Sequence, residues 1–561
     1  MVRFFKEPFP QNDHTEKLLE PVRKAAAEYL GTPIAALPFS TFKLLRQTGS
    51  RVEYEADYIA HRRRMNTMTA MALAEPNDER WLFELEDILW AVCDEYTWAL
   101  PAHIPEGASP DEIIACLDLF ACETGCALSE ILDLLGERLH PQVRERIEHA
   151  LHERIIEPFL AKRHRNYGQN NWAAVCGGCS AAVVLRLGTK KQAAAAMEHA
   201  DELMRDFLAS YHDDGCCLEG SLYWAYGFGY FCYYAALVRD YTGGKIDWFR
   251  DEKIRHIAEF RQKVYLKDTY VIPFADTPHN IDFHIGLAHF LAKEYDTVTL
   301  PDERFEAQFD DDIRYRFCDF IRDFYWYDPM LSARPLAENG AYDFRDAQWM
   351  IRKQGTCVFA AKGGHNNEPH NHNDVGSFLL FDDGRYILDD LGWPEYTSWY
   401  FGPRRLENIC ACSRGHSLPV IGGAVQKSGK EHAARVVEWN ERTFTLDLSK
   451  AYDLPGVGVV RRLDFDGEQI KLCDTFTGCE TSEVRERFVT RCVPEVQGNV
   501  VSIEGWTITC EQACRVSVET ATFEPRMSIC KMDMKPVETA YLIDFVPEKT
   551  EEKLEFRISK K

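Results

Sequence analysis

The sequence predicts two unlike domains, an α-helical domain over residues 1–330 and an antiparallel β-sandwich over residues 331–561. Three observations indicate this. The 561 residues exceed what one hydrophobic core usually holds. Apolar residues recur every three or four positions in the first part and every second position in the last. Between the two parts, residues 328–343 are rich in proline, asparagine and glycine, which is typical of a linker.

The first domain is predicted to contain eleven amphipathic helices joined by short links. Consecutive helices on short loops pack as antiparallel neighbours, so the array is either a solenoid or a ring closed on itself. No regular repeat period is visible in the sequence, which disfavours a solenoid. We expect the helices near residues 17–30, 56–74, 81–98, 111–136, 142–160, 172–187, 191–211, 221–240, 251–266, 283–296 and 311–326.

The second domain is predicted from short runs of period two with tight turns between them. Asp383-Gly384 and Asp466-Gly467 each separate two such runs, which predicts two β-hairpins. Further short runs of the same kind follow up to the end of the chain. Many short strands with almost no helix favour a β-sandwich.

Composition and charge exclude several classes of protein. Hydrophobic residues make up 45% and charged residues 27%, as in ordinary globular chains. The net charge of −24 repels nucleic acid and anionic membranes, so neither is an expected partner. No apolar run approaches the ~18 residues of a membrane span. Nineteen cysteines behind an N-terminus without a secretory signal predict a reducing, cytoplasmic setting. Whether the chain forms a homo-oligomer stays open.

The densest polar cluster in the sequence occupies residues 365–374, at the start of the β domain. It contains three histidines and two acidic residues. An extended backbone there would place His370 and His372 on one side, so both imidazoles could reach one site. Such a cluster is suited either to binding a metal or to acid–base chemistry.

Two later segments could complete a metal site with this cluster. Asp389 and Asp390 end a predicted strand, and His416 precedes another. A divalent metal held by oxygen and nitrogen would be satisfied by His372, His416 and one of the two aspartates.

In the helical half, two segments carry polar and aromatic side chains. Asn170 and Asn171 begin an apolar helix, where asparagine commonly caps the first turn. Residues 213–230 combine acidic residues with Tyr223 and Tyr226 at helical spacing. Most aromatic stripes belong to a core, but sugars also bind well on mixed aromatic and polar walls.

Taken together, these segments resemble the heparinase II/III-like polysaccharide lyases. The family's architecture is an incomplete (α/α) toroid followed by an antiparallel β-sandwich, in agreement with the domain pattern above. The matching motifs keep the family's order and cover roughly residues 165–425. They are Asn-Asn-Trp at 170–172, Glu-Gly-x-x-Tyr-Trp-x-Tyr-Gly at 219–227, His-x-His-x-Asp-x-x-Ser-Phe at 370–378, Ile-Leu-Asp-Asp-x-Gly at 387–392 and Ser-Arg-x-His-Ser at 413–417.

The resemblance implies β-elimination at a 4-linked uronic acid, in glycosaminoglycan-like polysaccharides or oligosaccharides. A donor must neutralise the uronate carboxylate, a base must remove the C5 proton, and an acid must protonate O4. By resemblance, Asn171 is the donor, and His370 and Tyr223 are the acid–base groups. Tyr226, one turn along, is the alternative tyrosine. Some relatives carry a histidine where this chain has Trp172, which removes one candidate base.

The same resemblance implies a structural divalent metal, with Zn²⁺ preferred, held by His372, Asp390 and His416. Asp389 could replace its neighbour Asp390. Further substrate contacts are expected from residues near these motifs and from a basic pair that could attract an acidic glycan to an acidic protein. These predicted contacts are Asn170, Glu219, Trp224, Arg404 and Arg405.

Two other classes of function stay open. A carbohydrate-binding protein could keep this fold without the chemistry, although binding alone needs no acid–base set. A glycoside hydrolase would need a pair of carboxylates near the cleft. The obvious candidates for that pair are Asp213, Asp214 and Glu219.

Overall fold

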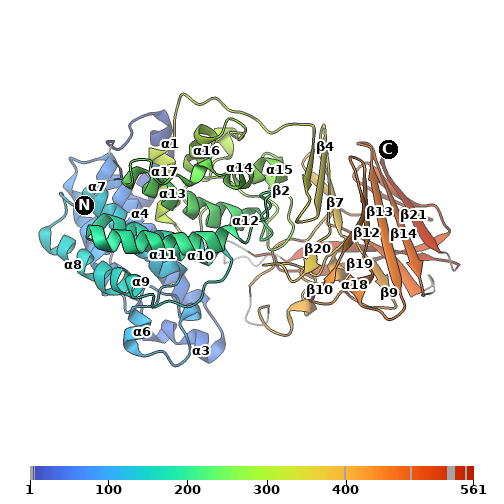
Figure 1. The fold of residues 1–561 in the computed structure, drawn as a ribbon, viewed down its shortest axis with the longest axis horizontal. Coiled ribbons are helices and arrows are strands. Elements are labelled where there is room, and N and C mark those ends of the chain that lie inside the picture. The colour runs from blue at the N-terminus through green and yellow to red at the C-terminus, as the bar shows by residue number, and fades with distance from the viewer. Residues whose placement is uncertain (1–3, 6, 397–399, 480–482, 527–536, 550–551) are drawn as a thin grey trace.

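The computed structural model describes residues 4–5, 7–396, 400–479, 483–526, 537–549 and 552–561. Its element order confirms the predicted fold class, with helices first and an antiparallel β domain after them (Figure 1). No helix in these ranges is both long and apolar enough to cross a membrane.

The helical domain closes into a ring. Its last long helix, α17, contacts helices α4 and α7 from the start of the domain, as a toroid requires and a solenoid does not. Asparagine, aspartate or threonine side chains cap several helix starts, including those of α1, α5, α7, α10 and α11. The longer helices are α1 (Asp13–Tyr29), α4 (Val52–Ala74), α5 (Glu79–Asp94), α7 (Leu119–Leu135), α8 (Pro141–Leu151), α10 (Asn171–Leu187), α11 (Lys190–Leu208), α13 (Gly229–Tyr241), α14 (Glu252–Ala258), α16 (Ile285–Glu294) and α17 (Phe317–Tyr325).

Short helices fill the links: α2 (Phe39–Phe42), α3 (Leu44–Thr48), α6 (Pro110–Ile114), α9 (Glu157–Leu160), α12 (Ser221–Tyr223) and α15 (Phe260–Val264). Three predicted helices are interrupted: 111–136 is split into α6 and α7, 142–160 contains a π-helical turn at 152–156, and 221–240 is broken as well. A π-helical turn over residues 224–228 separates α12 from α13. At this turn a Cβ on Gly227 would lie 3.0 Å from Cβ of Asn171, so the glycine permits a close approach to the start of α10.

The predicted helix 251–266 also differs. It breaks at Glu259 and ends in a small hairpin of β1 (Tyr265–Lys267) and β2 (Tyr270–Val271). The loop after β2 leads to residues 274–277, which face the β domain. This loop becomes important below.

The β domain consists of antiparallel sheets. A five-stranded sheet has the order β3-β4-β5-β7-β8, an eight-stranded sheet β11-β12-β13-β14-β21-β18-β17-β16, and a four-stranded sheet β19-β20-β15-β9, while β10 pairs with β6. The strands are β3 (Gly340–Phe344), β4 (Trp349–Gln354), β5 (Cys357–Lys362), β6 (His365–Asn366), β7 (Phe378–Asp382), β8 (Arg385–Leu388), β9 (Pro419–Ile421), β10 (Gly429–Ala433), β11 (Arg435–Trp439), β12 (Thr443–Asp447), β13 (Gly458–Phe465), β14 (Gln469–Thr477), β15 (Val484–Thr490), β16 (Glu495–Gln497), β17 (Val500–Ile503), β18 (Trp506–Cys510), β19 (Cys514–Phe523), β20 (Glu538–Pro547) and β21 (Lys553–Lys560). The short helix α18 (Ser449–Tyr452) and 3₁₀ turns at Arg405–Glu407 and Ser413–Gly415 lie between them.

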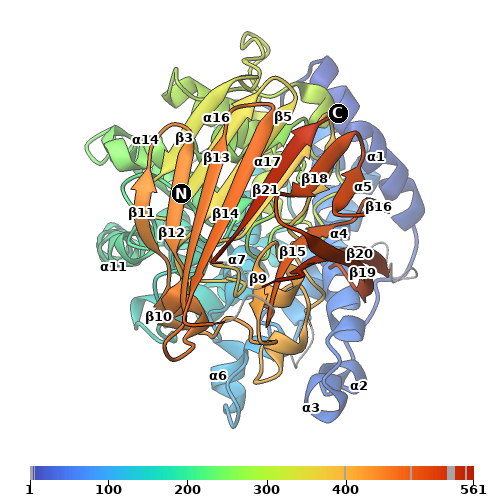
Figure 2. The ribbon, with the colours of Figure 1, turned by 90° about the vertical axis from the view of Figure 1, so that its right-hand side faces the viewer.

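The five-stranded sheet joins the two halves of the molecule. Successive side chains on a strand point to opposite faces. Accordingly Val358 and Phe381 pack into the core of the helical domain, whereas Phe359 and Phe378 pack against the eight-stranded sheet. Both faces are therefore buried, and the layers run from helices to one sheet to the next (Figure 1). Figure 2 shows the outer layer, with β13, β14 and β21 side by side.

Candidate active site

A buried carboxylate that the sequence analysis did not identify forms the centre of the site. Asp276 lies in the loop after β2 and is fully buried. Its Oδ2 accepts hydrogen bonds from Nδ1 of His370 at 2.9 Å and from the Tyr396 hydroxyl at 2.7 Å. Its Oδ1 accepts from the Tyr400 hydroxyl at 2.7 Å and from Nε2 of His372 at 3.2 Å. Four side chains of the β domain thus meet on one aspartate of the helical domain.

The charge of Asp276 follows from these contacts. Burial raises the pKa of a carboxyl group, but the hydrogen bonds from His370 and His372 outweigh that effect and hold the pKa of Asp276 well below its usual range. The carboxylate is therefore ionised at neutral pH. An ionised acceptor fixes Nδ1–H of His370 as a donor and leaves Nε2 as the other ring nitrogen of the site.

Tyr223 and His370 lie face to face. Their rings stack with centroids 4.1 Å apart. The Tyr223 hydroxyl is 3.0 Å from the hydroxyl of Tyr396, which in turn donates to Asp276. Burial raises the pKa of Tyr223, and the nearby Asp276 adds to the shift. Tyr223 therefore stays protonated at neutral pH.

The backbone around His370 is not the extended strand that the sequence analysis expected. Residues 367–376 form a loop between β6 and β7, and His370 has a positive φ of 56°. Such a conformation is uncommon for a residue other than glycine and persists where surrounding contacts fix it. His370 and His372 nevertheless reach the same group, because they contact the two oxygens of Asp276.

The two asparagines at the start of α10 have different roles. Asn170 caps the helix, since its Oδ1 accepts from the Trp172 amide and its Nδ2 donates to the Tyr167 carbonyl. Its predicted contact with substrate is thus not supported. Asn171 is buried and donates from Nδ2 to Oε2 of Glu219 at 3.3 Å.

Glu219 connects Asn171 to the histidine. Its Oε2 lies 3.8 Å from Nε2 of His370. Burial raises the pKa of Glu219, although the charge of His370 opposes the shift. The site therefore presents an amide donor and a carboxyl group that holds a proton more readily than usual.

Two glycines allow these segments to meet. Gly220 has a φ of +93°, and a Cβ there would lie 1.8 Å from Oγ1 of Thr277. Gly392 has a φ of +65°, and its Cβ would lie 2.6 Å from the Thr277 carbonyl oxygen. The Glu-Gly motif and the Asp-x-Gly motif therefore approach the Asp276 loop from opposite domains.

The alternative tyrosine and the predicted tryptophan lie elsewhere. The Tyr226 hydroxyl donates to Glu123, and the guanidinium of Arg316 lies 4.2 Å from the centroid of the Tyr226 ring. Tyr226 thus belongs to an inner cluster of the toroid. Trp224 is buried and its indole nitrogen donates to the Ile257 carbonyl at 2.7 Å. The expected sugar contact of Trp224 must be corrected, because a core position cannot present its ring to a ligand.

Arg404 and Arg405, the predicted basic pair, also lie in different surroundings. Arg404 is exposed and forms an ion pair with Glu407 on its own turn. Arg405 instead donates to the Asn371 carbonyl at 2.7 Å and to the Tyr400 hydroxyl at 3.1 Å. Only the second arginine adjoins the Asp276 cluster.

The three predicted metal ligands lie close together, and Asp374 joins them as a fourth candidate. The donor atoms of His372, Asp374, Asp390 and His416 lie within 4.8 Å of one another, and all four side chains are buried. One atom of each is buried without a hydrogen bond of good geometry to a described residue, although Nδ1 of His416 and Oδ2 of Asp390 lie 3.2 Å apart. These atoms are Nδ1 of both histidines and Oδ2 of both aspartates. Two imidazole nitrogens and two carboxylate oxygens with unused lone pairs fit a divalent metal.

The opposite atom of each potential ligand is held by a neighbour. Nε2 of His416 donates to the Cys410 carbonyl at 2.8 Å, and Nε2 of His372 donates to Asp276. When the two rings are neutral, these bonds leave the lone pair of each ring on Nδ1, which faces the shared centre. Oδ1 of Asp390 accepts from the Gly392 amide at 3.0 Å, and Oδ1 of Asp374 accepts from Nζ of Lys362 at 2.8 Å.

The choice between the adjacent aspartates follows from their partners. Asp389 accepts from Nε2 of His279 at 2.9 Å and from Nε of Arg491 at 2.6 Å. Both of its oxygens are thus engaged. This geometry favours Asp390 as the ligand.

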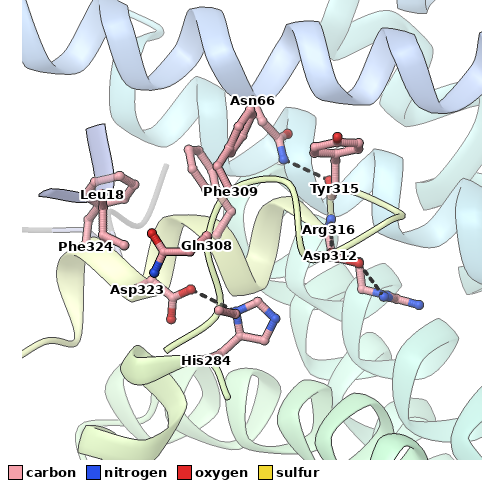
Figure 3. A pocket seen from close by; sticks show the side chains of 12 residues that line it. Leu18, Asn66, His284, Gln308, Phe309, Asp312, Tyr315, Arg316, Asp323 and Phe324 are labelled. Atoms are coloured by element: carbon pink, nitrogen blue, oxygen red, sulfur yellow. Dashed lines mark hydrogen bonds and ion pairs between the residues drawn. The ribbon is translucent and has the colours of Figure 1, made fainter. Parts of the chain in front are cut away.

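A separate small cavity lies inside the helical ring (Figure 3). His284 and Asp323 form an ion pair on its wall at 2.8 Å, near the pair of Asp312 and Arg316. Burial lowers the pKa of His284, but Asp323 and Asp319 outweigh burial and raise it to about 10. As far as the chain is described, the lining contains none of the residues predicted for the site.

Comparison with known proteins agrees with this fold. Residues 338–548 match the family model Heparinase II/III-like, C-terminal. Heparan sulfate lyase HepC from Pedobacter heparinus is 14% identical, with a TM-score of 0.61 over 97% of this chain and 88% of that one. A crystal structure of heparinase III is also 14% identical, with a TM-score of 0.67 over 98% of this chain and 85% of that one.

Chondroitin AC lyase from Streptomyces coelicolor A3 is 13% identical, with a TM-score of 0.53 over 98% of this chain and 83% of that one. No curated protein matches the sequence significantly. The predicted resemblance to the heparinase II/III-like lyases is thus confirmed, by the family model in the C-terminal domain and by the shared fold along the chain.

Proposed function

We propose that this protein is a lyase that cleaves 4-linked, uronic-acid-containing glycans by β-elimination, with glycosaminoglycan-like chains as substrates. One observation carries the proposal. Asn171, Tyr223 and His370 come from separate elements of two domains, yet they meet within one connected cluster around Asp276 and Glu219. Clefts between domains are common places for binding sites.

Asn171 and Glu219 are suited to the uronate carboxylate. The intermediate of β-elimination resembles an enolate dianion, so the carboxylate charge must be offset before the C5 proton can leave. Asn171 offers an amide donor, and the raised pKa of Glu219 lets its carboxyl group carry a proton to the same anion. Loss of one such donor costs about 10²–10³ in rate in other enzymes.

His370 and Tyr223 are suited to the two proton transfers. When the imidazole of His370 is neutral and Nδ1–H donates to Asp276, the lone pair lies on Nε2, which can then remove the C5 proton. The raised pKa of Tyr223 keeps its hydroxyl protonated, so it can donate to O4 as the C4–O4 bond breaks. Tyr396 holds that hydroxyl in place.

His372, Asp374, Asp390 and His416 would hold a divalent metal, for which we propose Zn²⁺. Bound there, the metal would supply rigidity to the β-domain wall of the site. Asp276 contacts both His372 and His370, so the ligand cluster and the proposed base share one anchor. Through this shared anchor, a bound metal would help to position His370.

The hydrolase alternative lacks its carboxylate pair. Asp213 is exposed, with Nζ of Lys253 at 3.7 Å, and Asp214 accepts from the amides of Cys216 and Asp346. Asp276 is saturated by four donors and cannot act as a second free carboxyl group. In the described part of the chain, neither Asp213 nor Asp214 contacts Glu219, so the predicted carboxylate pair does not form.

The experiment is a panel of uronate oligosaccharides incubated with the purified full-length chain. Elimination leaves an unsaturated uronate that absorbs in the near ultraviolet, whereas hydrolysis does not. We expect absorbance to rise with at least one acidic glycan, and to rise about 10²–10⁴ times more slowly with Tyr223→Phe. Binding without any cleavage across the panel would instead favour the non-catalytic alternative.

A further inference from the structure

Arg526 is positioned at the edge of the candidate site by backbone pairing. Its amide donates to the Trp393 carbonyl at 3.0 Å, and the Glu395 amide donates to the Glu524 carbonyl at 3.0 Å. Residues 524–526 therefore run beside the segment that carries Trp393 and Tyr396. A short backbone ladder of this kind fixes where the arginine side chain begins.

The guanidinium of Arg526 rests on two aromatic rings. It lies 4.1 Å from the ring centroid of Tyr396 and 4.5 Å from that of Trp393. The hydroxyl of the same Tyr396 contacts Tyr223 and Asp276. Stacking holds the planar cation in one orientation while its N–H groups stay available at the edge.

Within the described ranges, no carboxylate forms an ion pair with Arg526 and no acceptor takes a hydrogen bond from its guanidinium. This is unusual in a chain of net charge −24, in which neighbouring arginines are paired. Arg405 bonds the Asn371 carbonyl, and Arg491 pairs with Asp389 and Glu538. A fixed cation with unused donors is suited to an incoming anion.

The charge of Arg526 also acts on an arginine of the helical domain. Arg314 pairs with Glu55 at 3.1 Å. Its pKa is lowered to about 10, first by burial, and the positive charge of Arg526 contributes to the shift. The positive charge of Arg526 also lowers the pKa of Tyr223, which opposes the increase that burial causes. Arg526 is thus within electrostatic reach of the proposed acid and of a like charge in the other domain.

We propose that Arg526 forms an anion subsite for the acidic group of a sugar next to the cleaved uronate. The inference rests on the proposed lyase function, in which Asn171 and Glu219 take the carboxylate of the cleaved uronate itself. The group that Arg526 binds is therefore a second anion, a sulfate or a carboxylate. Glycans with at least two acidic groups around the scissile bond are then the preferred substrates.

The first test uses inorganic sulfate and needs no glycan. Melting temperatures of the full-length wild type and of Arg526→Gln are compared in sodium sulfate and in sodium chloride of equal ionic strength. Sulfate stabilises most proteins because it is excluded from their surface. Binding of sulfate at the subsite is therefore measured as the part of the increase in melting temperature that Arg526→Gln loses. Arg385→Gln, an exposed arginine of the same domain paired with Glu504, is the control and keeps the full shift.

The second test measures dissociation constants for a heparin-derived tetrasaccharide and for its desulfated counterpart. We expect Arg526→Gln to weaken binding about ten- to hundredfold, the usual effect of losing a charge-assisted contact, and Arg526→Lys to recover part of it. If Arg526→Gln loses affinity only for the sulfated tetrasaccharide, the group that Arg526 binds is a sulfate. If the variant loses affinity for both tetrasaccharides, the group is a carboxylate.

The two proposals can fail separately. If Arg526→Gln loses the sulfate-specific shift while the wild type cleaves no acidic glycan, the subsite stands and the lyase function falls. If Arg526→Gln keeps the whole shift and binds both tetrasaccharides as tightly as the wild type, the subsite is refuted, whatever the cleavage assay gives.

Discussion

Replacing Asp276 by asparagine should impair the site and the stability of the domain contact together. An asparagine has nearly the same shape, but one of its two terminal atoms is an N–H₂ group. In the wild type, each oxygen of Asp276 accepts two hydrogen bonds. In either orientation of the asparagine amide, its N–H₂ group replaces one oxygen, and the two donors that used this oxygen lose their acceptor. Two unmade buried hydrogen bonds at about 1–3 kcal/mol each give a loss of about 2–6 kcal/mol in the free energy of unfolding.

The same substitution should lower kcat by about 10²–10⁴, because Nδ1 of His370 loses the acceptor that fixes its tautomer. It should also weaken metal binding about 10- to 100-fold through His372. Denaturant unfolding, kcat and metal content measured on one preparation test all three effects.

The matched control is Asp544→Asn, a buried aspartate that accepts two hydrogen bonds from Arg487 far along the β domain. It should lose stability without losing kcat. If Asp276→Asn keeps kcat within threefold of the wild type while it folds, the assignment of Asp276 as the anchor of His370 is wrong.

Three further outcomes follow from the geometry. Tyr223→Phe should lower kcat by about 10²–10⁴ with an unchanged melting temperature, and a larger loss in Tyr226→Phe would move the acid one turn along the helix. Protein purified without chelator should carry bound metal by elemental analysis, and Asp390→Ala should lose it; an equal metal content in both would exclude this site. Arg405→Gln should raise KM more at low salt than at high salt, whereas Arg404→Gln should not, and equal effects would contradict the separation seen here.

The two-domain fold could be predicted from sequence because its signals are local. The switch from helical to alternating periodicity needs no tertiary information. The last residues of the predicted linker, 340–343, belong instead to β3. The interruption at residues 224–228 could not be predicted in this way, since the π turn arises where Gly227 packs against Asn171. The apolar pattern is the same on either side of it.

The site was predicted only where residues fall into spaced motifs. Asn171, Tyr223 and His370 do so. Asp276 does not: it is one aspartate in a loop, and its role comes from residues at least 94 positions further along the chain. Its complete burial among four donors becomes visible only in three dimensions.

Asp374 and Trp224 illustrate two further limits. Asp374 belongs to a recognised motif, but its spacing does not say that one oxygen lies near the other proposed metal ligands while the other accepts from Lys362. Trp224 sits in the richest aromatic motif, yet a ring that lines a cleft and a ring that fills a core have the same sequence pattern.

The most direct test of the central claim is the fate of solvent oxygen during cleavage. The purified protein is incubated with an acidic oligosaccharide that it cleaves, in water enriched in heavy oxygen, and the product masses are measured. Elimination predicts two products whose masses sum to that of the substrate, with an unsaturated end and no label introduced by the cleavage. Products that together exceed the substrate by one labelled water would show hydrolysis and contradict the account.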